Sequence, residues 1–325
     1  MLSLEAPIIA VIWQTLMAHT HRVALIPGTT AGLALCVWLI YLIDRLLDGL
    51  SAADMGGDIR HAFYRRHWRL IGLVVIPLVT ALLVWIALYL IPEGLLWQCS
   101  ALVLLVAIYL ACFPAQHHRR FVGALGGLIG FGVIVGIFML PLDAGPKIQF
   151  AIIGLLMMTF GFFHRLDKAA SSRIPKEPLG SLLFSLGCSA GVQFFSTGDG
   201  AAAISMDVLL LWMVFSMNMF GISRHENESG TVDGHSVAVL WPRLSQFYPV
   251  VLLGCLVACA AIALVPAAFP ARTGELALGC ALSLLLMGIV WLGRSRLGPL
   301  SYRVLADLAL TAPVAVLLLQ LGVFK

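Results

Sequence analysis

The prediction of the fold starts from one stretch, TTAGLALCVWLIYLIDRLLDG, residues 29–49. It is a long apolar run that ends with two aspartates, Asp44 and Asp48. The run has the length of a membrane helix, and Asp44 and Asp48 lie where that helix leaves the hydrocarbon. A spacing of four residues puts both carboxylates on one helical face, one turn apart. Two stacked carboxylates repel each other and are costly near lipid, so a cationic partner is expected. That partner is either a Mg²⁺ ion, which is usually held by one or two carboxylates plus substrate phosphates, or Arg45 and basic residues of the next loop.

Composition places the chain among the integral membrane proteins. Of its 325 residues, 61% are hydrophobic and 11% are charged, and the mean hydropathy is +0.99. These values lie far outside the range of soluble domains, and the apolar runs have the length of membrane helices. We expect an all-α polytopic membrane helix bundle that forms a single membrane-embedded domain over residues 1–325. About eleven transmembrane helices are predicted, near residues 6–20, 28–46, 68–91, 96–113, 121–140, 148–165, 179–196, 204–222, 246–268, 274–293 and 302–322.

The distribution of basic residues predicts the topology. With the N-terminus in the cytoplasm, all but four of the 20 Lys and Arg residues fall in inside loops or helix ends; the four are Arg22, Lys147, Arg272 and Lys325. Cytoplasmic loops carry an excess of Lys and Arg, so we expect the N-terminus inside and the C-terminus outside. The first residues lack a basic region and a small-residue cleavage pattern, which predicts no cleavable signal and suits a bacterial inner membrane.

The polar segment 164–177 falls on the predicted cytoplasmic side and leads into Pro178, which suits the first turn of a helix. Lys176, at this interface, either holds a diphosphate oxygen as a point charge or anchors the helix by the positive-inside rule. The outside connections are short, turn-like stretches. Polar chemistry is therefore concentrated on one face, as an active site open to the cytoplasm would require.

A second acidic segment, residues 218–228, follows the predicted helix near 204–222. Asn218 lies one turn inside the membrane end, where an amide needs a partner. Glu226 lies eight residues further on, so both side chains are able to face one cavity if the helix continues. Arg224 and His225 lie between them and are suited to pair with acids or with a phosphate. The alternative is a solvated loop cluster.

Several other functions lack their sequence signatures. The seven cysteines all fall in apolar helices without a CxxC spacing, and GxSxG, P-loop and HExxH motifs are absent. No basic–aromatic surface of the kind that binds nucleic acid is present. A transporter would break helices in both halves with polar residues, but only Asp207 and Asp307 are near-buried acids. A CDP-alcohol phosphotransferase needs DxxDG, whereas Asp44 and Asp48 are separated by three residues.

Two acidic clusters on one side, each closing a helix of an all-α membrane bundle, resemble the UbiA superfamily of intramembrane prenyltransferases. The first motif of that family, NDxxDxxxD, is similar to the stretch that contains Asp44 and Asp48 at the end of the second helix. Ile40 and Tyr41 replace its Asn and its first Asp. Residues 176–187 are similar to the KR…G lead into the family's fifth helix.

The second motif of the family aligns with residues 218–228, where Asn, Ser and Glu replace aspartates. A rival alignment uses residues 164–168, and we prefer 218–228 because it is more acidic. Family members usually have nine helices. The alignment makes residues 114–165 an extra helical pair, which preserves sidedness because two crossings cancel.

The resemblance implies Mg²⁺-dependent transfer of an isoprenyl group from an isoprenyl diphosphate to a lipophilic acceptor inside the membrane. It implies one Mg²⁺ on Asp44 and Asp48 and a second on Glu226 with Asn218 or Glu228. Four cationic residues would face the diphosphate: Lys176, Arg173, Arg224 and Arg45. If the substrate's own alkene captures the allylic cation, the same apparatus is a terpene cyclase. A non-catalytic relative that binds a lipid or assembles with partners is the third possibility, because half of the expected aspartates are missing.

Overall fold

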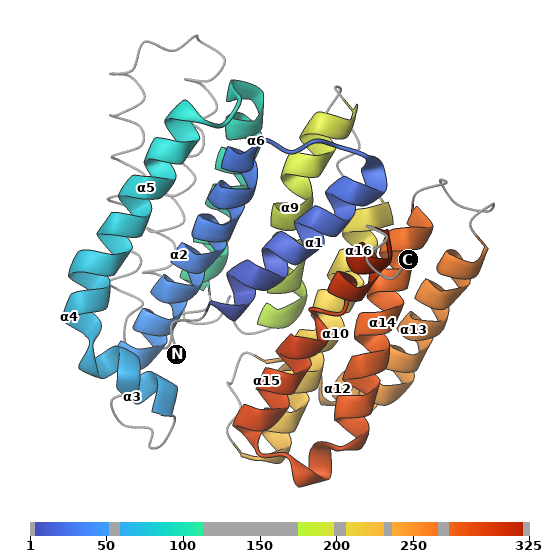
Figure 1. Ribbon diagram of the computed structural model, residues 1–325. Helices are drawn as coiled ribbons and strands as arrows, with labels where there is room; N and C mark the ends of the chain where they lie inside the picture. Colours follow the sequence, from blue (N-terminus) through green and yellow to red (C-terminus); the bar gives the residue numbers. More distant parts are fainter. Residues whose placement is uncertain are drawn as a thin grey trace. The chain divides into compact units, whose positions relative to one another are not determined.

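The computed structural model describes residues 4–51, 59–112, 175–197, 206–230, 236–265 and 273–320, in which every regular element is a helix (Figure 1). Six helical spans of the described chain are long and apolar enough to cross a membrane: Pro27–Leu46, Trp68–Tyr89, Lys176–Ser196, Met206–Glu228, Thr273–Leu292 and Pro299–Gln320, the last of which consists of two helices. Two shorter apolar helices are Glu93–Val106 and Tyr248–Leu264. This agrees with the predicted all-α membrane helix bundle. The predicted helices near 121–140 and 148–165 lie outside the described residues, so the number eleven stays a prediction.

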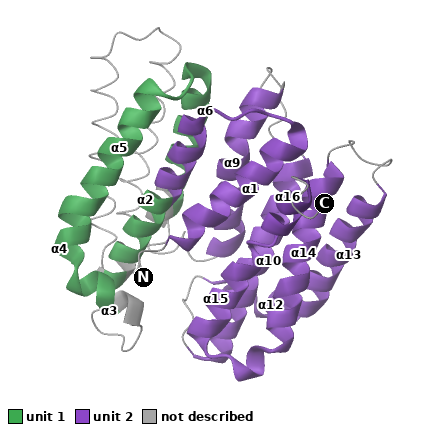
Figure 2. Cartoon of the chain, viewed as in Figure 1, with its two compact units in different colours: residues 1–3, 38–173 green, residues 4–37, 174–325 purple. Residues whose placement is uncertain are grey.

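The chain divides into two compact units, which are coloured separately in Figure 2. Unit 1 contains residues 1–3 and 38–173, and unit 2 contains residues 4–37 and 174–325. Each unit is described by itself. The helices of unit 1 are the second part of α2 (Pro27–Ser51), α3 (Ile59–Arg66), α4 (Trp68–Leu70), η1 (Ile71–Val75), α5 (Ile76–Tyr89) and α6 (Glu93–Cys112).

In unit 1, the end of α2 that carries Asp44 packs through an apolar cluster. Leu42 of α2, Tyr64 of α3 and Ile71 of η1 are buried together. η1 is a single π-helical turn just before Pro77, whose missing N–H removes one hydrogen bond from the helix. The predicted helix near 68–91 is therefore present, with a wide turn near its start.

Unit 2 is built around α10. Its helices are α1 (Glu5–His21), the first part of α2, α9 (Lys176–Thr197), α10 (Met206–Glu228), α11 (Val237–Leu240), α12 (Pro242–Gln246), α13 (Tyr248–Leu264), α14 (Thr273–Leu292), η3 (Arg294–Arg296), α15 (Pro299–Ala309) and α16 (Pro313–Gln320). α10 contacts α9, α13, α14 and α15. In its apolar window 67% of the residues are buried, against 50% or less in the other five candidate spans. Any polar side chain on α10 must therefore find its partner within the protein.

The predicted helix near 302–322 is two helices, because Pro313 interrupts it. Proline has no N–H to donate to the carbonyl four residues earlier, and the N–H of Val314 donates to Thr311 O at 3.0 Å rather than to Leu310 O. The carbonyl of Leu310 accepts a hydrogen bond from Trp13 Nε1 of α1 at 3.0 Å instead. Trp13 is fully buried, and its ring meets Phe215 of α10 edge-on, with 5.6 Å between the ring centroids. This contact joins α1 to the α15–α16 turn and to the central helix.

We expect Trp13→Phe to destabilise the protein by roughly 2 kcal/mol, because it leaves the Leu310 carbonyl unpaired and opens a small cavity. The measurement is thermal unfolding of the purified protein in detergent. The control is Trp241→Phe, because Trp241 also belongs to unit 2 but is 42% exposed. Equal unfolding temperatures for the two variants would contradict this account of the turn.

Candidate functional site

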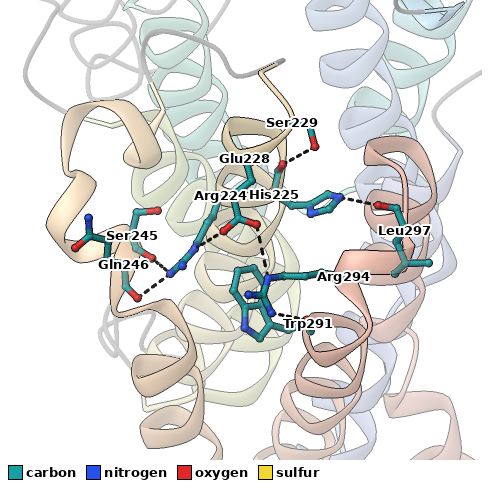
Figure 3. A network of polar contacts seen from close by, with 9 residues as sticks. All are labelled: Arg224, His225, Glu228, Ser229, Ser245, Gln246, Trp291, Arg294 and Leu297. Carbon is teal, nitrogen blue, oxygen red and sulfur yellow. Dashed lines mark hydrogen bonds and ion pairs between the residues drawn. The ribbon is translucent and has the colours of Figure 1, made fainter.

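Charged side chains of several helices form ion pairs at the C-terminal end of α10, and Figure 3 shows those around Arg224, Glu228 and Arg294. The arginine cluster, as we define it, consists of two separate groups at this end of α10: Arg224 and Glu228 of α10 with Arg294 of η3, and Glu226 of α10 with Arg303 of α15. Glu226 is two residues from Arg224 and from Glu228, so its side chain leaves the helix on a different side from theirs. α10 continues past the apolar segment to Glu228, so residues 224 and 228 lie one turn apart on the same face. The segment predicted as the second acidic motif is thus helical through residue 228.

Glu228 bridges two arginines of the cluster. One carboxylate oxygen lies 3.1 Å from Arg224 Nε, and the other lies 3.6 Å from Arg294 Nε. Arg224 Nη1 also donates to the carbonyls of Ser245 and Gln246, the latter at 2.7 Å, which closes the end of α12 against α10. The Glu228 side chain is 42% exposed, so solvent screens both ion pairs.

Trp291, at the end of α14, orders the same two cations. The guanidinium carbon of Arg224 lies 4.9 Å from the centre of its ring, and that of Arg294 lies 4.1 Å from it. Arg294 Nη1 donates to the Trp291 carbonyl at 3.2 Å. Trp291 is buried, and cation–π contacts of this kind hold a guanidinium in a defined place. Two positive charges are therefore pre-positioned at this end of unit 2.

Glu226 pairs with Arg303 across the α10–α15 contact at 3.2 Å. Their side chains are only 23% and 24% exposed, so this pair is less screened than those of Glu228. The sequence predicted Glu226 as a metal ligand. In the described part of the chain its carboxylate faces a guanidinium.

Further along α10, Asn218 also contacts α15. Its Nδ2 donates to Asp307 Oδ1 at 3.0 Å, and the residue is 5% exposed. Its Oδ1 is buried and has no hydrogen-bond partner among the described residues. Eight residues of helix separate Asn218 from Glu226, which corresponds to about 12 Å along the axis. The Asn218–Asp307 pair thus lies deeper in unit 2 than the arginine cluster.

His225 packs between the arginine cluster and the aromatic side chains of unit 2. Its ring stacks on Tyr302 with 4.4 Å between centroids, and its Nε2 lies 3.2 Å from the Leu297 carbonyl, to which it donates. One turn earlier, Gly221 makes room for two tyrosines: a Cβ there would lie 2.5 Å from the hydroxyl oxygen of Tyr248 and 2.9 Å from that of Tyr302. A larger residue at 221 would displace these rings and with them the surroundings of His225.

Lys176 and Glu177 open α9 in unit 2. Glu177 is 2% exposed, and both of its carboxylate oxygens accept the Val237 N–H, at 3.1 and 3.0 Å. This carboxylate therefore ties the start of α9 to the segment that follows α10. Lys176 is half-buried next to it, as expected for a basic residue at the entry to a membrane helix.

The first acidic motif belongs to unit 1. Asp44 and Arg45 are half-buried on α2, while the side chain of Asp48 and the whole of Arg173 lie outside the described residues. Asp44 and the arginine cluster belong to different units, so their predicted convergence stays a prediction.

The described donors of unit 2 fit an anion better than a metal ion. Among the described residues, no three His, Cys, Asp or Glu side chains are grouped as they would be in a metal site. Glu226 and Glu228 both face arginines, so a second Mg²⁺ would have to displace those partners. A Mg²⁺ held by one or two carboxylates plus substrate phosphates needs no such group. The predicted ion on Asp44 and Asp48 is compatible with this finding.

The structure adds Trp291, Arg294, Arg303 and Asp307 to the candidate site. They come from α14, η3 and α15, some 65 to 90 residues after the acidic segment they contact. Arg303 and Asp307 have the same spacing of four as Asp44 and Asp48, and they are the two charged residues of α15. That spacing was the one signal in the sequence from which their shared face could have been found.

Comparison with known proteins finds no relative of this chain. No family model matches the chain, and neither the curated proteins nor the solved structures yield a match. The resemblance to the UbiA superfamily therefore rests on the quoted motifs alone and stays a prediction.

A double-mutant cycle will rank the ion pairs of the arginine cluster. We expect a coupling energy of about 1 kcal/mol for Glu226→Gln with Arg303→Gln, because that pair is three-quarters buried. For Glu228→Gln with Arg294→Gln we expect about 0.3 kcal/mol, because solvent screens that pair. The free energy of unfolding in detergent is the measurement. A larger coupling for the second pair would show that burial does not control these interactions.

Proposed function

We propose that the protein is an intramembrane transferase that moves an isoprenyl group from an isoprenyl diphosphate to a lipophilic acceptor. The observation that carries this proposal is the arginine cluster. It holds three guanidiniums at one end of a unit composed mainly of apolar helices. An isoprenyl diphosphate has the matching shape, because its apolar chain belongs in the membrane and its anionic head at the membrane surface. Arginine is well suited to such a head, since its planar fork binds phosphate oxygens in pairs.

In this proposal the arginines stabilise the leaving group. When the bond between the isoprenyl carbon and the diphosphate oxygen breaks, the electron pair stays with the diphosphate and its negative charge grows. Guanidiniums already in place lower the energy of that charge without reorganising. Glu226 and Glu228 keep Arg303, Arg224 and Arg294 ordered until the diphosphate replaces the carboxylates as their partner. Lys176 and the predicted Arg45 and Arg173 would add positive charge around the same head group.

In this proposal Mg²⁺ is bound by Asp44 and Asp48 only. When bound there with the diphosphate, it would supply further neutralisation of the leaving oxygens. We assign no step to a second ion, because the described acids of unit 2 already face arginines. A terpene cyclase would use the same leaving-group chemistry, with an alkene of the substrate in place of the acceptor.

A non-catalytic function is the second candidate, and a specific observation favours it. Both glutamates of the second acidic segment are ion-paired, and the first motif lacks two of the family's polar positions. A protein with neutralised acids would still bind an anionic lipid head group through Arg224, Arg294 and Arg303.

The decisive assay is release of pyrophosphate by the purified full chain from geranyl, farnesyl and geranylgeranyl diphosphate. We expect Mg²⁺-dependent release that falls about a hundredfold in Asp44→Asn, because the metal loses a ligand. We expect a fall of about tenfold or more in Arg303→Gln, because one charged hydrogen bond to the diphosphate is lost.

Asp207→Asn is the matched control. It makes the same carboxylate-to-amide change as Asp44→Asn, at the end of α10 remote from the arginine cluster, and should keep full activity. No release from any of the three donors, together with no Mg²⁺-dependent binding of an isoprenyl thiodiphosphate, would establish the non-catalytic alternative.

A further inference from the structure

Exposed arginines gather in unit 1, where α3 ends and a candidate membrane span begins. The Trp68 corner, as we define it, consists of Arg65, Arg66, Trp68 and Arg69, and all four side chains are exposed. The span that starts here is Trp68–Tyr89. Residues 59–92 contain four arginines and no Asp or Glu. The corner therefore carries a positive charge that no acid of its own segment neutralises.

Packing and a cation–π contact give the corner a defined shape. Tyr64 of α3 and Ile71 of η1 are buried against Leu42 of α2, so the turn between α3 and α4 is held to a neighbouring helix. The guanidinium carbon of Arg69 lies 5.4 Å from the centre of the Trp68 ring, within the range of a cation–π interaction. Tryptophan is typical of the membrane–water interface, where its amphipathic ring suits the level of the head groups. Trp68 thus positions Arg69 at the level of the lipid phosphates.

Exposed side chains continue from the corner as one stripe along the span. α4, η1 and α5 form one uninterrupted helix (Figure 1). Exposed pairs of residues recur every fourth position, at 69–70, 73–74, 77–78 and 81–82. Ile71, Val79 and Ile86, between and beyond these pairs, are buried. Residues four apart lie on the same side of a helix, so Arg69 is the charged end of a stripe that is otherwise apolar.

The stripe has the length and the polarity of a phospholipid. From Arg69 to Leu78 the helix rises about 14 Å, close to half of a hydrocarbon core of about 30 Å. A lipid with its phosphate at Arg69 therefore has acyl chains that follow the stripe to the middle of the bilayer. The planar fork of arginine binds phosphate oxygens in pairs. A zwitterionic head group carries a cation of its own, which the arginines repel, so the corner favours an anionic lipid.

We propose that the Trp68 corner is a docking site for one anionic phospholipid, with its phosphate on Arg66 and Arg69 and its acyl chains along the stripe from Leu70 to Leu82. A second copy of this chain fits less well, because its own corner would bring the same positive charge to the same level of the membrane. The site lies wholly within unit 1 and does not depend on the proposed transferase activity.

The test measures lipid binding by native mass spectrometry of the full chain in detergent. Dioleoylphosphatidylglycerol and dioleoylphosphatidylcholine are titrated in turn, because their acyl chains are identical and only the first is anionic. We expect the wild-type protein to bind the anionic lipid about twentyfold more tightly, since each arginine near a lipid surface contributes about fivefold in affinity. Arg66→Gln with Arg69→Gln should remove this preference and leave the affinity for the phosphatidylcholine unchanged.

Two further variants separate a docking site from general attraction to anionic lipid. Arg66→Lys with Arg69→Lys keeps both charges but loses the planar fork, so the preference should fall to about fivefold. Arg243→Gln is the matched control and should keep the full preference. Arg243 is exposed close to the start of the apolar helix Tyr248–Leu264 and near the exposed Trp241, but it is the one arginine of α12.

Equal affinities of the wild-type protein for the two lipids would overturn the inference. An undiminished preference in the lysine variant would also overturn it, and so would a loss in Arg243→Gln as large as that in the glutamine variant, because each would indicate attraction to surface charge in general. A dimer without bound lipid that dissociates in the glutamine variant would show that a second copy covers this face instead. All substituted side chains are exposed, and equal unfolding temperatures without lipid will verify that the variants fold.

Discussion

The stability of unit 2 depends on the hydrogen bonds and ion pairs that the polar side chains of α10, its most buried span, make without water. α10 carries acids, an amide, an imidazole and hydroxyls, yet two-thirds of its apolar window is buried. Several of these groups have partners on neighbouring helices, which matters because lipid offers none. Asp207 reaches His21 of α1 at 2.7 Å, while Asn218 and Glu226 reach Asp307 and Arg303 of α15.

These pairings give the two ends of α10 different chemistry. At its N-terminal end an acid meets a histidine, and at its C-terminal end two acids meet three arginines. Trp291 and the carbonyls that follow α12 fix two of those arginines in place. A cationic, pre-positioned end on an apolar unit matches an amphiphile with an anionic head, which is the physical basis of the proposed function. Which side of the membrane this end faces stays a prediction of the positive-inside rule.

The sequence predicted where the helices lie better than it predicted which side chains of different helices contact one another. Apolar runs located α2, α5, α9, α10, α13 and α14, because burial in lipid requires long apolar helices. The run near 302–322 looked continuous, and only the contact with Trp13 shows how the break at Pro313 is used. Glu226 and Glu228 read as metal ligands in isolation. Their arginine partners lie on η3 and α15 or one turn away on α10, and a single sequence does not report which distant helices pack together.

The same limit applies to the first acidic motif. Asp44 packs with unit 1, through Leu42 and its partners on α3 and η1, whereas the arginine cluster belongs to unit 2. That these two groups serve one diphosphate stays a prediction of the proposed function.

A structure of the full chain bound to an isoprenyl thiodiphosphate and Mg²⁺ tests this prediction most directly. The account predicts one diphosphate that contacts Arg303 and shares its metal ion with Asp44 and Asp48. A diphosphate bound by only one of the two groups, with the other group turned away from it, would contradict the account.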